Sequence, residues 1–165
     1  MQVAVCGPAR CSDALAAQAH RVGELLAARG AIVLCGGGGG VMAAVSAGAR
    51  RAGGLVVGVL PGPDRHDANP DLSAAIVTNL GQARNAIIVQ SADAVIAVGG
   101  SWGTVSEVAL AMRRGGVPVV SLGGWQLQDH NGDPVPGLHT ADSPEQAVAL
   151  ALGSAPPGTH PPSGA

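Results

Sequence analysis

Three glycine-rich turns give this 165-residue sequence the residue types and spacing that suit the binding of an anionic ligand. They contain Gly7, the run Gly36–Gly40 and the run Gly99–Thr104, and each follows an apolar, strand-like stretch. Unpaired backbone N–H groups at such turns attract phosphate, and glycine lets the phosphate approach the backbone. We expect a phosphate on the N–H groups of residues 100–105, with the Thr104 hydroxyl as an added donor.

One arginine and one glutamate flank the third turn and are the candidate catalytic pair. Arg84 precedes it and Glu107 follows it. The spacing Thr104-x-x-Glu107 is also that of a helix capping box, in which the glutamate only satisfies a backbone N–H group. Taken by itself, Arg84 fits a solvent-exposed position on a helix. The Trp102 side chain could either stack on the base of a ligand or cover the end of a helix. The candidate ligand-binding residues are Gly7, Gly36, Gly37, Gly38, Gly100, Ser101, Trp102, Gly103 and Thr104.

Two other kinds of site are disfavoured. Gly38-x-Gly40-x-x-Ala43 with Asp64 loosely fits a dinucleotide-binding fingerprint, but that fingerprint belongs on the first strand-to-helix turn, and a five-glycine run matches many patterns by chance. A later loop has the composition of a metal site but carries prolines and no helical register, which favours a solvated loop and no metal. Its residues are Asp64, His66, Asp67 and Asp71.

Composition excludes several functions. The nine basic residues are all arginine, so neither a pyridoxal phosphate Schiff base nor a Walker-A phosphate loop can form. A net charge of −2 with 12% charged residues argues against nucleic-acid binding. Three cysteines without CxxC spacing indicate neither a disulfide framework nor a zinc site and fit a reducing cytoplasm. No apolar run approaches the ~18 residues of a membrane span, and no membrane partner is expected.

Strand-like and helix-like segments alternate along the chain. Strands are predicted at residues 3–6, 31–35, 55–60, 75–78, 93–98 and 117–122. Helices are predicted at residues 13–29, 41–52, 82–91, 104–114 and about 144–152, with an irregular polar stretch at 125–136. This alternation predicts a Rossmann-like three-layer α/β/α sandwich with a mostly parallel sheet, formed by a single domain at residues 1–152. Residues 153–165 are rich in Pro, Gly and Ser and are expected to be disordered.

The segment from Arg84 to Glu107 resembles the paired signature of the Lonely Guy family, long labelled lysine decarboxylases. In that signature an arginine precedes a PGGxGTxxE motif, and Arg84 and Glu107 fall on its arginine and glutamate. Cys35–Ser46 is similar to a second family element, GGGxxGLMGxxA. The resemblance spans about residues 3 to 122 and implies cleavage of the N-glycosidic bond of nucleoside 5′-monophosphates to free base and ribose 5-phosphate, without a cofactor.

The resemblance assigns roles to the candidate pair. Glu107 would engage the ribose and support attack by water, and Arg84 would anchor the substrate. A carboxylate beside the sugar suits the oxocarbenium-like state of glycosidic cleavage. Because the sequence contains no lysine, a pyridoxal-dependent decarboxylase is excluded.

Two departures from the family pattern favour an alternative function. Gly99-Gly100-Ser101 replaces Pro-Gly-Gly, and Asn85 stands where a basic residue is expected beside the arginine. This pattern is closer to a shorter subgroup that includes molybdenum-cofactor carrier proteins, which bind a phosphorylated pterin and do not hydrolyse a nucleotide. The predicted function is therefore a phosphoribohydrolase or, alternatively, a non-catalytic carrier. The resemblance and the apolar helix face of Val105, Val108 and Met112 lead us to expect a homodimer.

Overall fold

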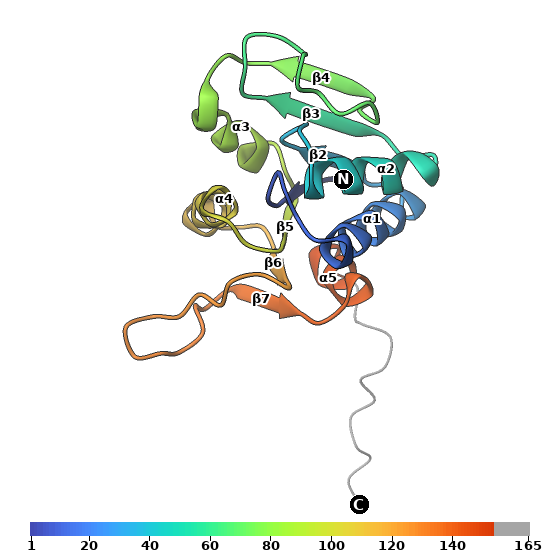
Figure 1. Cartoon of the computed structure of the whole chain (residues 1–165). Helices are drawn as coiled ribbons and strands as arrows, with labels where there is room; N and C mark the ends of the chain where they lie inside the picture. Colours follow the sequence, from blue (N-terminus) through green and yellow to red (C-terminus); the bar gives the residue numbers. More distant parts are fainter. Residues whose placement is uncertain (154–165) are drawn as a thin grey trace, which may run out of the picture.

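The computed structural model describes residues 1–153, which form a parallel sheet with helices on both faces (Figure 1). The strand order is β4-β3-β2-β1-β5-β6-β7. The strands are β1 (Gln2–Cys6), β2 (Ile32–Cys35), β3 (Val56–Leu60), β4 (Ala74–Val77), β5 (Ala94–Val98), β6 (Val119–Leu122) and β7 (Leu138–Ala141). The helices are α1 (Asp13–Ala28), α2 (Val41–Arg51), α3 (Asn85–Gln90), α4 (Trp102–Arg114) and α5 (Pro144–Ala151), with a short 3₁₀ helix, η1 (Gly81–Arg84), before α3.

The sheet is buried between two helical layers, and the predicted three-layer α/β fold is confirmed. In Figure 1, α1, α2 and α5 lie on one face, and α3 and α4 on the other. Successive side chains of β1 alternate between the two cores, because a strand has a period of two. Val3 and Val5 pack in the core under α1 and α2, whereas Ala4 and Cys6 pack with residues of α3 and α4. Strands covered on both faces read as continuous apolar runs, which is why β1 and β5 were recognisable.

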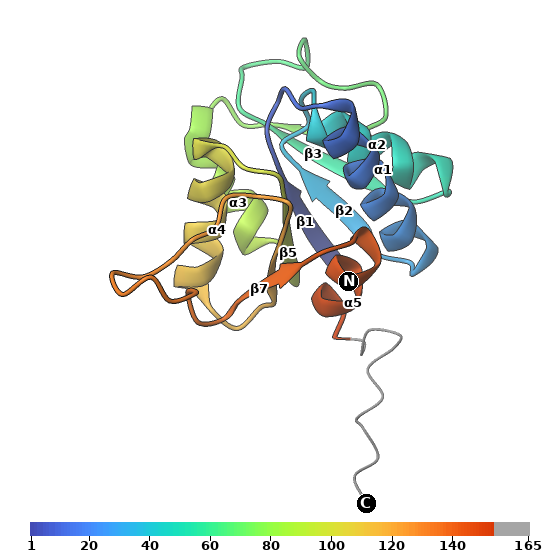
Figure 2. The same cartoon turned by 60° about the horizontal axis from the view of Figure 1, so that its bottom comes forward.

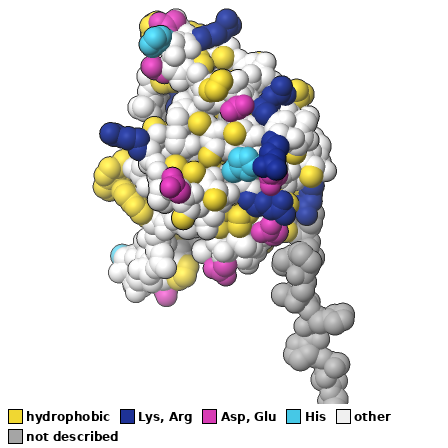
Figure 3. Space-filling model, turned by 45° about the vertical axis from the view of Figure 1, so that its right-hand side comes forward, with side chains coloured by type: hydrophobic (Ala, Val, Ile, Leu, Met, Phe, Trp, Pro, Cys, Tyr) yellow, Lys and Arg dark blue, Asp and Glu magenta, His cyan; other side chains and the backbone are white. Residues whose placement is uncertain are grey.

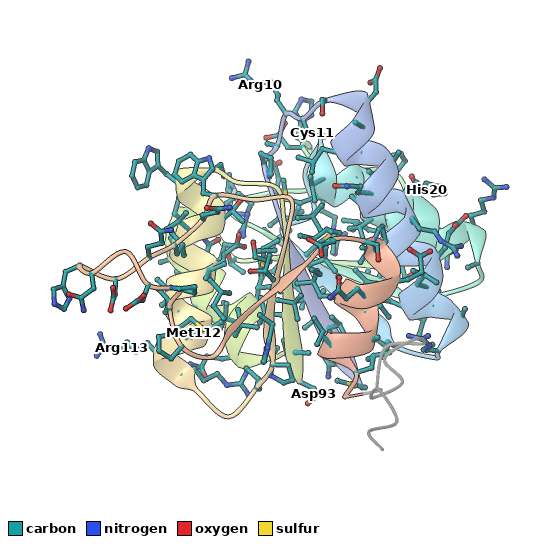
Figure 4. The ribbon with its side chains drawn as sticks, turned by 90° about the horizontal axis from the view of Figure 1, so that it is seen from below. Arg10, Cys11, His20, Asp93, Met112 and Arg113 are labelled. Atoms are coloured by element: carbon teal, nitrogen blue, oxygen red, sulfur yellow. The ribbon has the colours of Figure 1, made fainter. Side chains whose placement is uncertain are left out.

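The sheet reverses its winding direction between β1 and β5. From β1 the chain moves outward through β2 and β3 to β4, and it then returns to place β5 on the other side of β1. The loops after β1 and β5 therefore leave the carboxyl edge of the sheet in opposite directions, which opens a crevice there. In Figure 4 this edge lies toward Arg10 and Cys11, and the amino edge lies toward Asp93.

Serine side chains cap three of the helices that start at this edge. Ser12 caps α1, Ser101 caps α4 and Ser143 caps α5, each by accepting a hydrogen bond from the backbone N–H group three residues later. Pro144 occupies the first turn of α5, where its missing N–H group costs nothing.

The structure differs from the sequence prediction in three elements. β7 (Leu138–Ala141) was not predicted, because a half-exposed edge strand with the sequence Leu-His-Thr-Ala carries little apolar signal. The helix predicted at 82–91 divides into η1 and α3. Val108 of the apolar helix face expected at a dimer interface is instead buried against the sheet.

The surface charges are mixed in sign. On the face shown in Figure 3, arginines lie beside acidic side chains and form no continuous basic stripe. In one such arrangement in the described residues, Arg21 contacts Glu145 at 2.8 Å and Glu24 at 3.3 Å. Within residues 1–153, no helix is both long enough and apolar enough to cross a bilayer. The tail predicted at 153–165 lies outside the described residues, apart from Gly153.

Candidate functional site

A cavity of about 190 Å³ lies at the carboxyl edge, where the sheet reverses direction. The turn after β1, the first glycine after β2, the end of η1 and the start of α4 form its walls. All three predicted glycine turns thus meet the Arg84 and Glu107 side chains in one place, and the turn after β2 contributes Gly36.

Arg84 is a buried cation with an unused hydrogen-bond donor. Arg84 is only 7% exposed. Its Nη1 donates to Asn85 Oδ1 at 2.5 Å and lies 3.5 Å from Glu107 Oε1. Its Nε has no partner within the described residues. A buried guanidinium N–H group without a partner costs free energy, which an acceptor from a ligand would recover.

Gly36 makes the position of Arg84 possible. A Cβ atom at residue 36 would lie 2.5 Å from Arg84 Nη2 and 2.7 Å from Met42 Sδ. Because Gly36 has no side chain, the guanidinium group can lie directly over the backbone at the end of β2.

Asn85 links the arginine to the turn after β5. Its Oδ1 accepts from Arg84, its Nδ2 donates to Ser106 Oγ at 3.0 Å, and Ser106 Oγ donates to the Gly103 carbonyl at 2.8 Å. A neutral amide can serve both as acceptor and as donor here, whereas a lysine or arginine could only donate. Asn85 therefore orients Arg84 and ties it to α4.

We expect Asn85→Ala to weaken binding of a phosphorylated ligand about tenfold, because it removes one charge-assisted hydrogen bond and frees Arg84 to reorient. Isothermal calorimetry with guanosine 5′-monophosphate measures this change. Asn131→Ala, in the exposed loop before β7, is the matched control and should leave the affinity unchanged. An unaltered affinity in Asn85→Ala would contradict the orienting role.

Glu107 is not the partner of a capping box. The N-cap of α4 is Ser101, whose Oγ accepts from Thr104 N at 3.2 Å, and Glu107 lies one further turn into the helix. Its side chain is buried, and burial raises the pKa of Glu107 to about 7, although Arg84 and the Cys6 thiol act in the opposite direction. Burial, together with the Glu107 carboxylate, also raises the pKa of Cys6 well above its usual value, so its thiol stays protonated and can donate.

Glu107 should make the protein less stable as the pH rises. Its folded pKa of about 7 lies above the value of 4.5 in the unfolded chain, so the folded state holds a proton that the unfolded state releases between these pH values. Stability that is present below pH 4.5 is thus lost as pH rises toward 7 and beyond. We expect this group to lower the free energy of unfolding by about 2 kcal/mol between pH 5.5 and 7.5.

Urea unfolding of the wild type and of Glu107→Gln at the two pH values measures this effect. The glutamine variant removes the titrating group and should lose that part of the pH dependence, while the remaining groups titrate equally in both proteins. Parallel pH profiles for the two proteins would show that the carboxyl group is not perturbed.

The predicted site residues divide into two groups. The cavity is lined by seven of them, namely Gly7, Gly36, Arg84, Ser101, Gly103, Thr104 and Glu107. The other four lie outside its lining. The carbonyl groups of Gly37 and Gly38 accept from the Asn69 side chain, and Gly100 packs against Trp125. Trp102 is 79% exposed, and its ring forms a T-shaped pair with the ring of Trp125 at a centroid distance of 5.0 Å.

Six further lining residues were not among the predicted site residues. They are Cys6, Pro8, Ala9, Met42, Gln82 and Asn85. Asn85 is adjacent to Arg84 in the sequence, and Cys6 ends the first strand immediately before Gly7, so position alone was a usable signal for both. Met42 and Gln82 carry no such signal. In the described part of the chain, no three His, Cys, Asp or Glu side chains are grouped to hold a metal ion, and Asp64 accepts from the His66 backbone.

Comparison with known proteins places this geometry in a family. Residues 1–148 match the SLOG cluster4 family. A protein of Archaeoglobus fulgidus is 40% identical over 154 residues, which cover 93% of this chain and 96% of that protein. The structure of the molybdenum cofactor binding protein from Rippkaea orientalis is 36% identical with a TM-score of 0.82, over 92% of this chain and 95% of that one.

A second solved structure, the molybdenum cofactor carrier protein of Chlamydomonas reinhardtii, is 34% identical with a TM-score of 0.80, again over 92% of this chain and 95% of that one. These similarities agree with the resemblance drawn from the segment between Arg84 and Glu107. The chain belongs to the SLOG cluster4 family, whose members share the Lonely Guy-like α/β fold.

Proposed function

We propose that this protein binds a phosphorylated pterin, the molybdenum cofactor, and carries it intact as cargo. The solved structures that it resembles at 36% and 34% identity are described as molybdenum cofactor binding and carrier proteins. The alternative function predicted from Asn85 and from Gly99-Gly100-Ser101 therefore has better support than hydrolysis.

The unpartnered Nε of Arg84 is the observation that carries this proposal. Arg84 and Glu107 are the charged residues in the cavity lining, so an ionised Glu107 leaves the lining neutral and a protonated one leaves it with one positive charge. Arg84 Nε, the Thr104 hydroxyl and the N–H groups at the start of α4 together supply donors for a phosphate monoester. A phosphate oxygen on Nε would satisfy the orphaned donor.

The cavity fits the phosphate end of such a ligand and not the whole of it. Its volume of about 190 Å³ is below the ~300 Å³ at which pockets begin to enclose drug-sized molecules. The phosphate would lie between Arg84 and the turn after β5, and the ring system would extend along the sheet edge.

Gel filtration of the protein after incubation with molybdenum cofactor released from a molybdoenzyme tests binding. The proposal predicts that cofactor elutes with the protein and is recovered unchanged. Elution of all of the cofactor at small-molecule volume would contradict the proposal.

A phosphoribohydrolase remains the second candidate because Glu107 lines the cavity with a pKa of about 7. A carboxyl group with that pKa is suited to exchange a proton near neutral pH. Incubation with adenosine 5′-monophosphate and cytokinin ribotides, with chromatography of released base, decides between the two functions. Base release that Glu107→Gln abolishes would establish hydrolysis, whereas binding without release supports the carrier.

We also propose a homodimer, as the family resemblance implies, and a cytoplasmic location, which the free cysteines Cys6, Cys11 and Cys35 fit. Light scattering should then give about twice the 16.0 kDa of one chain. A mass of one chain would contradict the dimer without affecting the ligand site.

A further inference from the structure

We propose that a second cavity, at the carboxyl ends of β6 and β7, binds a flat 2-amino-4-oxo heterocycle of the guanine or pterin type. This inference rests on the proposed function in one respect, because it supplies the ring site that the smaller phosphate cavity lacks. The volume of this second cavity is about 450 Å³, within the range of pockets that hold small organic ligands.

The second cavity is formed by the turn after β6 and the loop that leads to β7. This loop projects from the body of the molecule in Figures 1 and 2. The first cavity lies on the other side of the turn Gly99–Ser101. A small void of about 10 Å³ under this turn is lined both by Thr104, which also lines the first cavity, and by Trp125, which also lines the second. The two cavities therefore flank the same glycine turn on one edge of the sheet.

The lining of the second cavity is suited to an uncharged ring with hydrogen-bonding edges. Gln18, Gln128, Ser121 and Thr140 contribute neutral groups that can donate or accept. Asp142 is the one charged residue in the lining that the structure describes, and no cation accompanies it. The cavity thus has no group to attract a phosphate and one carboxylate to attract N–H donors.

Asp142 lines the cavity, and its backbone is fixed at the start of α5. Its backbone N–H donates to Gln146 Oε1 at 2.8 Å, at the start of α5. Guanine and pterin each present a ring N–H beside an exocyclic amino group, and a carboxylate accepts both in a paired arrangement. Adenine and cytosine lack this pair of donors, so Asp142 provides a basis for selectivity.

The aromatic residues of the whole chain are gathered at this cavity. The sequence contains two tryptophans and no phenylalanine or tyrosine. Trp125 lines the cavity and is 46% exposed, and Trp102 contacts it edge to face. A Cβ atom at Gly100 would lie 2.6 Å from Trp125 Cδ1, so the glycine makes room for the indole ring. A fixed and partly exposed indole offers a stacking surface for a planar heterocycle.

Equilibrium dialysis with unphosphorylated probes tests this ring site. Neopterin and guanosine should bind at least tenfold more tightly than adenosine. Asp142→Asn should remove that preference, since the amide presents a donor to one of the two ring N–H groups. Asp133→Asn, an exposed residue of the same loop that does not line the cavity, should stay within twofold of the wild type.

Tryptophan fluorescence locates the binding. Without tyrosine, all intrinsic emission comes from Trp102 and Trp125, so guanosine should quench it with the saturation curve found by dialysis. Trp125→Leu should weaken the binding of neopterin, guanosine and adenosine about tenfold or more, because stacking on the indole is lost. The proposal would be overturned by the absence of saturable binding at millimolar probe, by equal affinity for adenosine, or by unchanged selectivity in Asp142→Asn.

The probes separate this proposal from the proposed function. They carry no phosphate, so their binding does not depend on the guanidinium group of Arg84. Ring binding that persists while the cofactor fails to bind would refute the carrier function alone. Cofactor binding through Arg84 with no ring selectivity would refute the ring site alone.

Discussion

Arg84→Met is expected to weaken binding of guanosine 5′-monophosphate at least a hundredfold in isothermal calorimetry. The substitution removes a positive charge and every guanidinium N–H group from the cavity while keeping an unbranched side chain over Gly36. Hydrogen bonds to charged groups contribute about 1.5–3 kcal/mol each, and the loss of one or two corresponds to the stated factor. Guanosine without the phosphate should bind both proteins equally.

Arg113→Met is the matched control for this experiment. Arg113 is an exposed residue in the last turn of α4 and points away from the body of the molecule in Figure 4. Its replacement changes the net charge by the same amount without touching the cavity. Equal loss of affinity in the two variants would show that Arg84 acts only through overall charge.

Arg84→Met also leaves Glu107 buried without its cation. Removing one partner of a buried pair costs about 3–5 kcal/mol when the other stays charged, although Glu107 can take up a proton instead. The double variant Arg84→Met/Glu107→Gln has no buried charge and should regain much of the stability. Because it should not regain the affinity, the two measurements separate a loss of folding from a loss of phosphate binding.

Gly48→Ala is expected to destabilise the protein by about 3 kcal/mol or more in urea unfolding. α1 and α2 approach each other closely, and a Cβ atom at Gly48 would lie 1.9 Å from the His20 carbonyl oxygen of α1. Gly23 of α1 is restricted in the same way by the Val45 carbonyl oxygen at 2.2 Å. These obstacles are backbone atoms, so relief requires a helix to move, and overpacking of this kind costs 1–3 kcal/mol or more.

Gly62→Ala is the control for the helix contact. A Cβ atom there would meet nothing within 4 Å, and the backbone has no positive φ at this residue. Its unfolding midpoint should match that of the wild type. A Gly48→Ala protein with an unchanged midpoint would contradict the close helix packing, and with it the placement of α2 beside the cavity.

Periodicity and glycine placement predicted most of the fold. Buried parallel strands such as β1 and β5 are apolar throughout, and glycines end the intervening helices, so their order could be read directly. β7 was missed because an edge strand that is partly exposed does not need a continuous apolar run. The switch of direction between β1 and β5 depends on long-range pairing, which no local pattern specifies.

The candidate site was predictable in part for a similar reason. Arg84 and Glu107 were found through their spacing around a glycine turn, but their 3.5 Å approach depends on η1 and α4 meeting over β1. The sequence indicated Thr104 as the start of α4, and only the backbone shows that Ser101 is the N-cap. Trp102 was predicted at the same ligand, yet the helix turns it outward toward Trp125, beside the second cavity.

Mass spectrometry of ligand recovered from the purified protein tests the carrier function most directly. The protein would be expressed in cells that make molybdenum cofactor, purified under mild anaerobic conditions, and denatured to release its ligand. The proposed carrier function predicts intact molybdopterin at close to one per site in the wild type and at background in Arg84→Met. Background levels in both proteins, or recovery of free base with ribose 5-phosphate, would contradict a protein that holds its ligand without cleaving it.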